Sequence, residues 1–109
     1  MSGSDLFTGT LEILILKTLL GGPLHGYGIG RRLRDRSDGV LSVREGALYP
    51  ALQRLQKGGF IAGAWGKNET GRRAKFYELT PDGQRFLADE TRRWEQFSGA
   101  VAEILNEAS

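Results

Sequence analysis

The segment from Leu11 to Leu20, LEILILKTLL, is the feature that most constrains this 109-residue chain. Only Glu12, Lys17 and Thr18 interrupt its apolar residues, so a helix formed here is apolar on nearly every side. Such a helix must be covered on more than one face, and a chain of this length builds a single core. We therefore expect one structural unit with a buried first helix and a partner chain that completes its cover.

Composition argues against several classes of function. The chain has no cysteine and a single histidine, so it offers neither a thiolate nucleophile nor the usual ligand set of a zinc site. It also lacks a phosphate-binding glycine loop followed by lysine and serine or threonine, and an obvious pair of catalytic carboxylates. His25 lies in a predicted turn and is interpreted as a locally hydrogen-bonding residue. We predict that the protein is not an enzyme and needs no cofactor or metal.

The sequence also predicts where the protein resides. Its longest uninterrupted aliphatic run, Ile13 to Leu16, is too short to cross a membrane. No basic segment precedes that run as in a signal peptide. We therefore predict a cytoplasmic protein without a membrane partner.

Basic residues concentrate in the middle of the chain. Residues 31–75 carry eleven lysines and arginines against four acids, whereas the remainder carries four bases and nine acids. This asymmetry is expected when one part of a domain faces phosphate groups. Solvated helix faces would give the same pattern, so charge alone leaves both interpretations open.

Periodicity and capping residues predict three helices, two strands and a long last helix. Their expected positions are residues 11–20, 29–36, 44–57, 60–65, 75–79 and 81–106. Ser42 is expected to cap the third helix, and Thr80, followed by Pro81, the last one. Three helices followed by a hairpin are typical of a winged helix-turn-helix.

The predicted fold class is mainly α with a small β-hairpin (α+β), a winged helix-turn-helix plus a long C-terminal dimerisation helix. Residues 1–80 are expected to form the winged helix-turn-helix DNA-binding region. Residues 81–109 are expected to form the C-terminal dimerisation helix of the same structural unit.

The third predicted helix is expected to read DNA. Leu48, Leu52 and Leu55 share one stripe that must face the core, so the opposite stripe faces outward. Small residues at the start of that outer stripe allow close approach to base edges, and longer donors follow toward the phosphates. The predicted DNA-binding residues of this segment are Arg44, Gly46, Tyr49, Pro50, Gln53 and Arg54. The ring of Tyr49 fits either a DNA contact or internal packing, and the sequence leaves this open.

The hairpin loop adds a second predicted DNA contact. Lys67, Arg72 and Arg73 lie at or near its tip, where basic side chains can reach an adjacent groove or its phosphates. A solvated turn would have the same composition. The alternative function is a winged-helix module that binds an acidic protein partner instead of DNA.

The last predicted helix carries an apolar stripe. Leu87, Trp94 and Val101 recur every seven residues, and Phe97 and Ile104 repeat beside them. Packing on the first helix of the same chain would bury part of this stripe. Together, however, the two helices carry more apolar surface than a monomer usually exposes. We therefore predict a homodimer with the interface residues Leu14, Leu87, Trp94, Phe97, Val101 and Ile104.

Several short motifs follow one another in order along the chain. They are Leu24–Ile29 (LHGYGI), Gly46–Leu52 (GALYPAL) with Arg54 and Leu55, Gly59–Ile61, and Arg73–Thr80 (RAKFYELT) with Gly83. This set resembles the PadR family of transcriptional regulators, in particular its small members, over about residues 8–105. The resemblance implies a homodimeric repressor that binds a two-fold symmetric operator in double-stranded DNA and is released by a small ligand.

The resemblance also implies roles for particular segments. The C-terminal helix would pack on the partner's N-terminal and C-terminal helices, without the larger dimerisation domain of the long family members. DNA contacts would come from Arg44, Gly46, Tyr49, Arg54, Lys67 and Arg73. Similar drug-sensing members stack planar aromatic ligands on a tryptophan of the last helix, and Trp94 occupies that place. The implied effector is a planar aromatic or phenolic small molecule.

Overall fold

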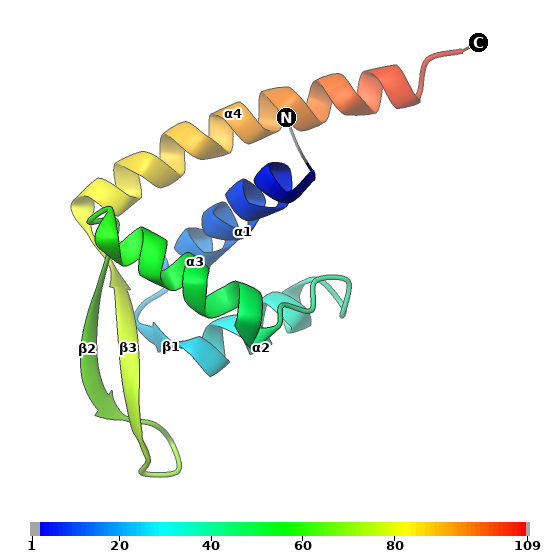
Figure 1. Ribbon diagram of the computed structural model, residues 1–109. Helices are drawn as coiled ribbons and strands as arrows, with labels where there is room; N and C mark the ends of the chain where they lie inside the picture. The colour runs from blue at the N-terminus through cyan, green and yellow to red at the C-terminus, as the bar shows by residue number, and fades with distance from the viewer. Residues whose placement is uncertain (1–2, 109) are drawn as a thin grey trace.

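The computed structural model describes residues 3–108 and the side chains of residues 9–108. Within that range the chain forms four helices and three strands (Figure 1). They are, in chain order, α1 (Gly3–Leu19), β1 (Leu24–His25), α2 (Gly26–Arg36), α3 (Glu45–Lys57), β2 (Ile61–Lys67), β3 (Arg73–Leu79) and α4 (Pro81–Leu105). This order confirms the predicted α+β winged-helix fold class with a long terminal helix.

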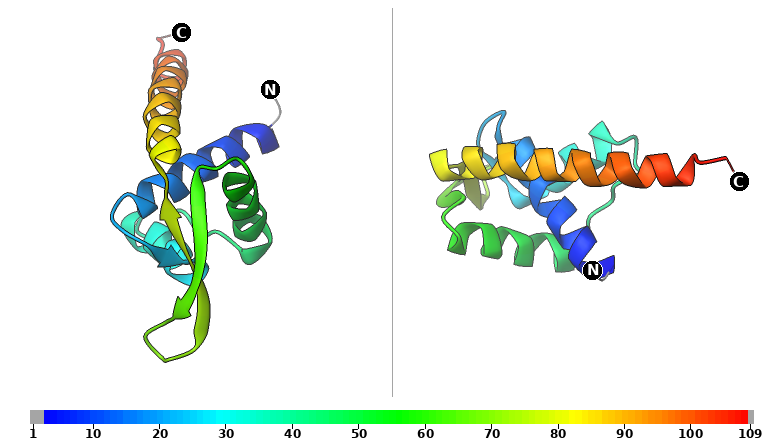
Figure 2. Two further views of the ribbon diagram at one scale, coloured as in Figure 1. Left: turned by 90° about the vertical axis from the view of Figure 1, so that its left-hand side faces the viewer. Right: turned by 90° about the horizontal axis from the view of Figure 1, so that it is seen from above.

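α1 is the centre of the core, as the apolar segment predicts. Its residues Leu11, Ile15, Leu16 and Leu19 are at most 3% exposed. α2 and α3 cover it from one side, and α4 crosses it from the other (Figures 1 and 2). The helix begins at Gly3, well before the predicted residue 11, so it is longer than its apolar segment alone indicates.

The start of the helix-turn-helix differs from the prediction. Leu24 and His25, expected in a turn, form β1, which pairs antiparallel with β3 and gives the sheet order β1-β3-β2. α2 follows at once from Gly26, three residues earlier than predicted. The Nδ1 atom of His25 accepts a hydrogen bond from the backbone N–H of Gly28 at 3.0 Å and so caps this helix. The local hydrogen-bonding role expected of His25 is confirmed.

The predicted cap of the third helix is wrong. Arg44 occupies the N-cap position of α3 and makes no side-chain capping bond, whereas Ser42 lies two residues before it. The carbonyl of Arg44 accepts from the backbone N–H groups of Ala47 and Leu48. The first turn is therefore held by main-chain bonds. The exposed acid of Glu45 also suits the positive end of the helix dipole.

A tight corner joins the end of α3, the base of the hairpin and the start of α4. The hydroxyl of Thr80 donates to the carbonyl of Gly59 at 2.7 Å and accepts from the backbone N–H of Gly83 at 3.0 Å. The backbone N–H of Thr80 donates to the carbonyl of Phe60, whose ring stacks on Phe86 with centroids 4.2 Å apart. Thr80 is thus the cap that the sequence predicts, and it also fixes where α4 leaves the hairpin.

Candidate nucleic-acid interface

α3 turns its predicted outer stripe to solvent. The buried side carries Leu48, Leu52 and Leu55. The exposed residues on the other side are Arg44, Gly46, Tyr49, Pro50, Gln53 and Arg54. Because Pro50 has no N–H, the carbonyl of Gly46 lacks its usual helical donor and stays an acceptor on this exposed side.

Tyr49 packs against its own subunit and is also accessible, so a contact with DNA stays a prediction. A Cβ atom on Gly26 would lie 3.0 Å from the Tyr49 hydroxyl oxygen, so the ring rests against the start of α2. The side chain is nevertheless 44% exposed. Burial, and after it the nearby Tyr49, raises the pKa of the Tyr77 hydroxyl above its ordinary value.

One face of the hairpin carries its cations and its exposed aromatic ring. Lys67 pairs in register with Arg73, and Trp65 with Lys75, so all four side chains share a face. The guanidinium carbon of Arg73 lies 4.5 Å from the centre of the Trp65 ring. This contact holds the Arg73 side chain along the hairpin, with its charge available to a partner.

The side chain and the main chain of Asn68 order the hairpin loop. The Asn68 amide oxygen accepts from the backbone N–H groups of Thr70 and Arg72 and from the Thr70 hydroxyl, over 2.8 to 3.1 Å. Gly71 adopts a φ of 81°, which favours glycine. The loop therefore presents Arg72 from a defined turn, beside Lys67 and Arg73 at the ends of the two strands.

The start of α2, Tyr49 of α3 and this face of the hairpin line one open groove of about 480 Å³. The residues that line it include Tyr27, Tyr49, Trp65, Arg73, Lys75 and Tyr77. Four aromatic rings, two cations and the acid Glu69 thus line a concave surface between the start of α2, Tyr49 of α3 and the wing. Phosphate groups and base edges are the partners that such a surface suits.

Arg54 stands apart from this groove. Its Nε atom donates to the Glu12 carboxylate of α1 at 2.8 Å, and its side chain is 48% exposed. This ion pair connects the end of α3 to α1. It also occupies the Arg54 guanidinium, which the sequence analysis predicts as a DNA contact. Glu12 lies 42 residues away in the chain, so no local pattern reveals the pair.

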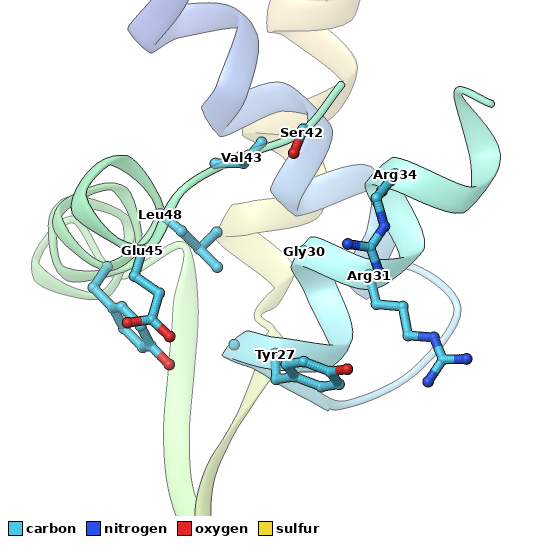
Figure 3. A pocket seen from close by; sticks show the side chains of 10 residues that line it. Tyr27, Gly30, Arg31, Arg34, Ser42, Val43, Glu45 and Leu48 are labelled. Carbon is cyan, nitrogen blue, oxygen red and sulfur yellow. The ribbon is translucent and has the colours of Figure 1, made fainter. Parts of the chain in front are cut away.

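α2 supplies residues that the sequence analysis did not assign to the interface. Tyr27, Arg31 and Arg34 line a small hollow of about 120 Å³, across from Glu45 and Leu48 of α3 (Figure 3). Tyr27 also lines the larger groove beside the hairpin, and its side chain is 68% exposed. The concentration of basic residues from residue 31 onward was a signal for Arg31 and Arg34, whereas Tyr27 had none beyond its motif.

The predicted dimer residues separate into two groups. Leu87 is 7% exposed and belongs to the subunit's own core, so its assignment to a dimer interface is corrected. α4 crosses α1 and then extends past the body (Figures 1 and 2). Trp94 still contacts Thr10 of α1. The exposed members are Trp94, Phe97, Val101 and Ile104, with Leu105 beside them. Leu14 packs partly against the core from the outer side of α1.

Trp94 lies between two hollows of about 260 and 310 Å³. Its indole N–H donates to the hydroxyl of Thr10 at 3.2 Å. Ile13 and Leu14 line the first hollow, and Phe97 and Val101 line the second. The indole is therefore accessible from both hollows.

The described part of the chain holds neither a membrane span nor a metal cluster. No helix there is both long and apolar enough to cross a bilayer. No group of three or more His, Asp or Glu side chains is placed to bind a metal ion.

Known proteins are similar to this chain in sequence and in fold. The profile of the transcriptional regulator PadR-like family matches residues 15–89. A solved transcriptional regulator from Clostridium thermocellum superposes with a TM-score of 0.82 at 30% identity, over 91% of this chain and 96% of its own. A PadR-like transcriptional regulator from Bacillus cereus gives 0.78 at 28%, over 95% and 99% of the two chains. An uncharacterised protein from Lysinibacillus sphaericus is 29% identical over 97% of this chain and 94% of its own.

Proposed function

The chain belongs to the PadR-like family of transcriptional regulators, and we propose that it is a homodimeric repressor that binds a specific DNA operator. The family and its solved members are transcriptional regulators and not enzymes, in agreement with the prediction from composition. Regulation of transcription through DNA binding follows from membership of the family. The operator contacts, the dimer and the response to a ligand are proposals for this chain.

The groove beside the hairpin, which Tyr49 of α3 also lines, is the observation that best supports DNA binding. In a winged helix-turn-helix the recognition helix enters the major groove, and a wing reaches a neighbouring groove or its phosphates. The exposed start of α3, with Gly46, Tyr49, Pro50 and Gln53, faces the base edges in this proposal. The wing cations are the phosphate contacts, namely Lys67, Arg72 and Arg73.

In this proposal the two parts of the chain have different roles within one structural unit. Residues 1–80 read DNA and residues 81–109 join two subunits, with the first turns of α4 also closing the core through Leu87. A two-fold dimer presents two α3 helices to a symmetric operator, with half-sites about 10 base pairs apart. Arg44 lies at the end of α3 nearest DNA, whereas the Glu12 ion pair leaves Arg54 a weaker candidate for a contact.

Removing the wing cations tests this proposal. Arg72→Ala with Arg73→Ala should weaken binding to the DNA upstream of the protein's own gene, because two phosphate contacts are lost. The slope of log affinity against log salt should become shallower by about 2, since each phosphate contact contributes roughly 0.9. Fluorescence anisotropy with labelled duplex over a salt series measures both effects.

The matched control removes two arginines from α4. Arg92 and Arg93 are exposed and pair with Asp89 and Glu90, away from the groove. Arg92→Ala with Arg93→Ala changes the net charge equally and should retain the wild-type salt slope. If the native protein binds duplex no better than background, the repressor proposal fails and the protein-binding winged-helix module becomes the better interpretation.

We further propose that a planar aromatic or phenolic effector binds at Trp94 and releases the repressor. The two hollows beside the indole, lined mainly by apolar side chains, support a site for a flat ring. Binding there would act on the proposed dimer interface, at a distance from the DNA-reading groove. The effector would therefore change the relative placement of the two α3 helices without touching DNA.

Fluorescence of Trp94 tests the effector site. Trp65→Phe removes the second reporter, and a panel of planar polycyclic and phenolic compounds is titrated without DNA. At least one compound should quench Trp94 and weaken operator binding over the same concentration range. The effector would bind elsewhere if a compound released DNA without quenching Trp94 and released it equally well from the Trp94→Ala variant.

A further inference from the structure

A tryptophan on the hairpin has no role in the proposed phosphate contacts. Trp65 lies on β2 and is 62% exposed. On the same face of the sheet, nearer the body, Ile61 and Tyr77 are only 2% and 7% exposed. The apolar surface of this face therefore continues past the core onto the free part of the hairpin.

The cations beside Trp65 leave most of its indole accessible. The Arg73 guanidinium carbon lies over the ring, 4.5 Å from its centre. Lys75 is the cross-strand partner of Trp65, but its ammonium group lies 5.7 Å from the centre of the Tyr77 ring. A Cβ atom on Gly63 would lie 2.5 Å from Lys75 Cε, so the Lys75 side chain runs over this glycine toward the body. The indole is thus held by one arginine and is otherwise open to a partner.

Trp65 faces the side of the molecule that is proposed to contact DNA. It lines the same groove as Tyr49, which belongs to the exposed side of α3. The hairpin also extends away from α4 (Figure 1). A dimer that forms through α4 therefore leaves the indole uncovered.

A contact at Trp65 would not depend on charge. The groove carries Arg73 and Lys75 but also Glu69, whose carboxylate repels phosphate groups. An aromatic ring gains affinity by stacking on bases, whatever the charge around it. In duplex DNA, proteins that bind the minor groove insert apolar side chains between base steps and so kink the duplex. An exposed indole on a wing suits this kind of contact.

We propose that Trp65 enters the minor groove beside the half-site contacted by α3 and stacks against an opened base step. This inference rests on the DNA binding of the proposed function and adds an uncharged contact to it. Arg73, stacked on the indole, holds the ring along the hairpin and directs its own charge to the phosphates. Because pyrimidine–purine steps kink most easily, Trp65 selects operators with such a step at this position.

Replacement of the indole tests the contact. Trp65→Ala should weaken binding to the DNA upstream of the protein's own gene by about tenfold or more, because a stacked base is lost. The slope of log affinity against log salt should keep its wild-type value, since the indole carries no charge. Trp65→Phe retains a ring and should recover most of the affinity. Fluorescence anisotropy with labelled duplex over a salt series measures these effects.

Arg72→Ala is the matched contrast on the same hairpin. It removes a proposed phosphate contact and keeps the indole, so it should lower the salt slope by about 0.9. Because Trp65 is exposed, Trp65→Ala should unfold at the wild-type temperature, and its loss of affinity then reports a lost contact with DNA.

Two further measurements show whether the ring reaches the bases. Unlabelled duplex should quench the tryptophan fluorescence of the wild type and leave that of Trp65→Phe, which retains only Trp94, almost unchanged. Energy transfer between dyes at the two ends of the duplex should rise when the wild type binds, because a wedge kinks DNA by roughly 20–90°. The rise should be smaller with Trp65→Ala.

The outcomes separate this inference from the proposed function. If Trp65→Ala binds with wild-type affinity, or if duplex binds the wild type without quenching it, the wedge is overturned while DNA binding through α3 and the wing cations stands. If the wild type binds duplex no better than background, DNA binding itself is overturned.

Discussion

Gly83→Ala is expected to destabilise the fold severely. A Cβ atom at this position would lie 2.0 Å from the carbonyl oxygen of Phe60 and 2.8 Å from Leu79 Cδ1. The Phe60 carbonyl cannot easily move away, because it accepts a hydrogen bond from the backbone N–H of Thr80. This bond fixes the corner between the hairpin and α4. Overpacking against a flexible core costs about 1 to 3 kcal/mol, and we expect at least the upper value against this backbone. The midpoint of thermal unfolding should fall by more than about 10 °C.

Gly99→Ala is the matched control for that experiment. Gly99 is also in α4, but a Cβ atom there meets nothing within 4 Å. Alanine favours the helix by roughly 1 kcal/mol over glycine, so this variant should be at least as stable as the wild type. Thermal unfolding followed by circular dichroism compares the two variants. Equal stability of Gly83→Ala and Gly99→Ala would mean that α4 does not approach Phe60 as closely as described.

Local signals in the sequence predicted those elements that depend on neighbouring residues. The pair Thr80 and Pro81 predicted the start of α4 to the residue, because capping needs only the chain around it. The leucine period of α3 likewise separated its buried side from its exposed side. Both patterns act over one or two helical turns, so tertiary structure did not change them.

Contacts between distant segments escaped the sequence analysis. β1 is only two residues long and exists because Leu24 and His25 pair with Tyr77 and Phe76, about fifty residues later. Arg54 was assigned to DNA from its place on α3, although Glu12 on α1 engages it. Neither partner can be identified from spacing along the chain.

The heptad stripe of α4 illustrates the same limit within a single helix. Leu87 and Trp94 occupy equivalent positions seven residues apart, yet they are 7% and 41% exposed. Periodicity gives the side of a helix on which a residue lies, but not where along the helix the body ends. The site residues of α3, the wing and the end of α4 therefore remain proposals that variants must test.

Val101→Glu is expected to abolish the dimer and most of the affinity for DNA. Val101 lies in the exposed stripe of α4, and a carboxylate there would be buried without a partner in an apolar interface. A monomer contacts a single half-site, so apparent affinity should fall by about 100-fold or more, toward the micromolar range of nonspecific binding. Sedimentation and anisotropy at the same protein concentrations should show the two losses together.

Gln96→Glu is the control for Val101→Glu. Gln96 is exposed on the same helix, about 140° around its axis from Val101, and its replacement adds the same charge. This variant should stay dimeric and bind DNA as the wild type does, because its side chain points away from the apolar stripe. If Val101→Glu were monomeric and still bound the operator with wild-type affinity, one subunit would be sufficient for recognition. The prediction of a symmetric operator would then fail, since only a pair of linked α3 helices requires two half-sites at a set spacing.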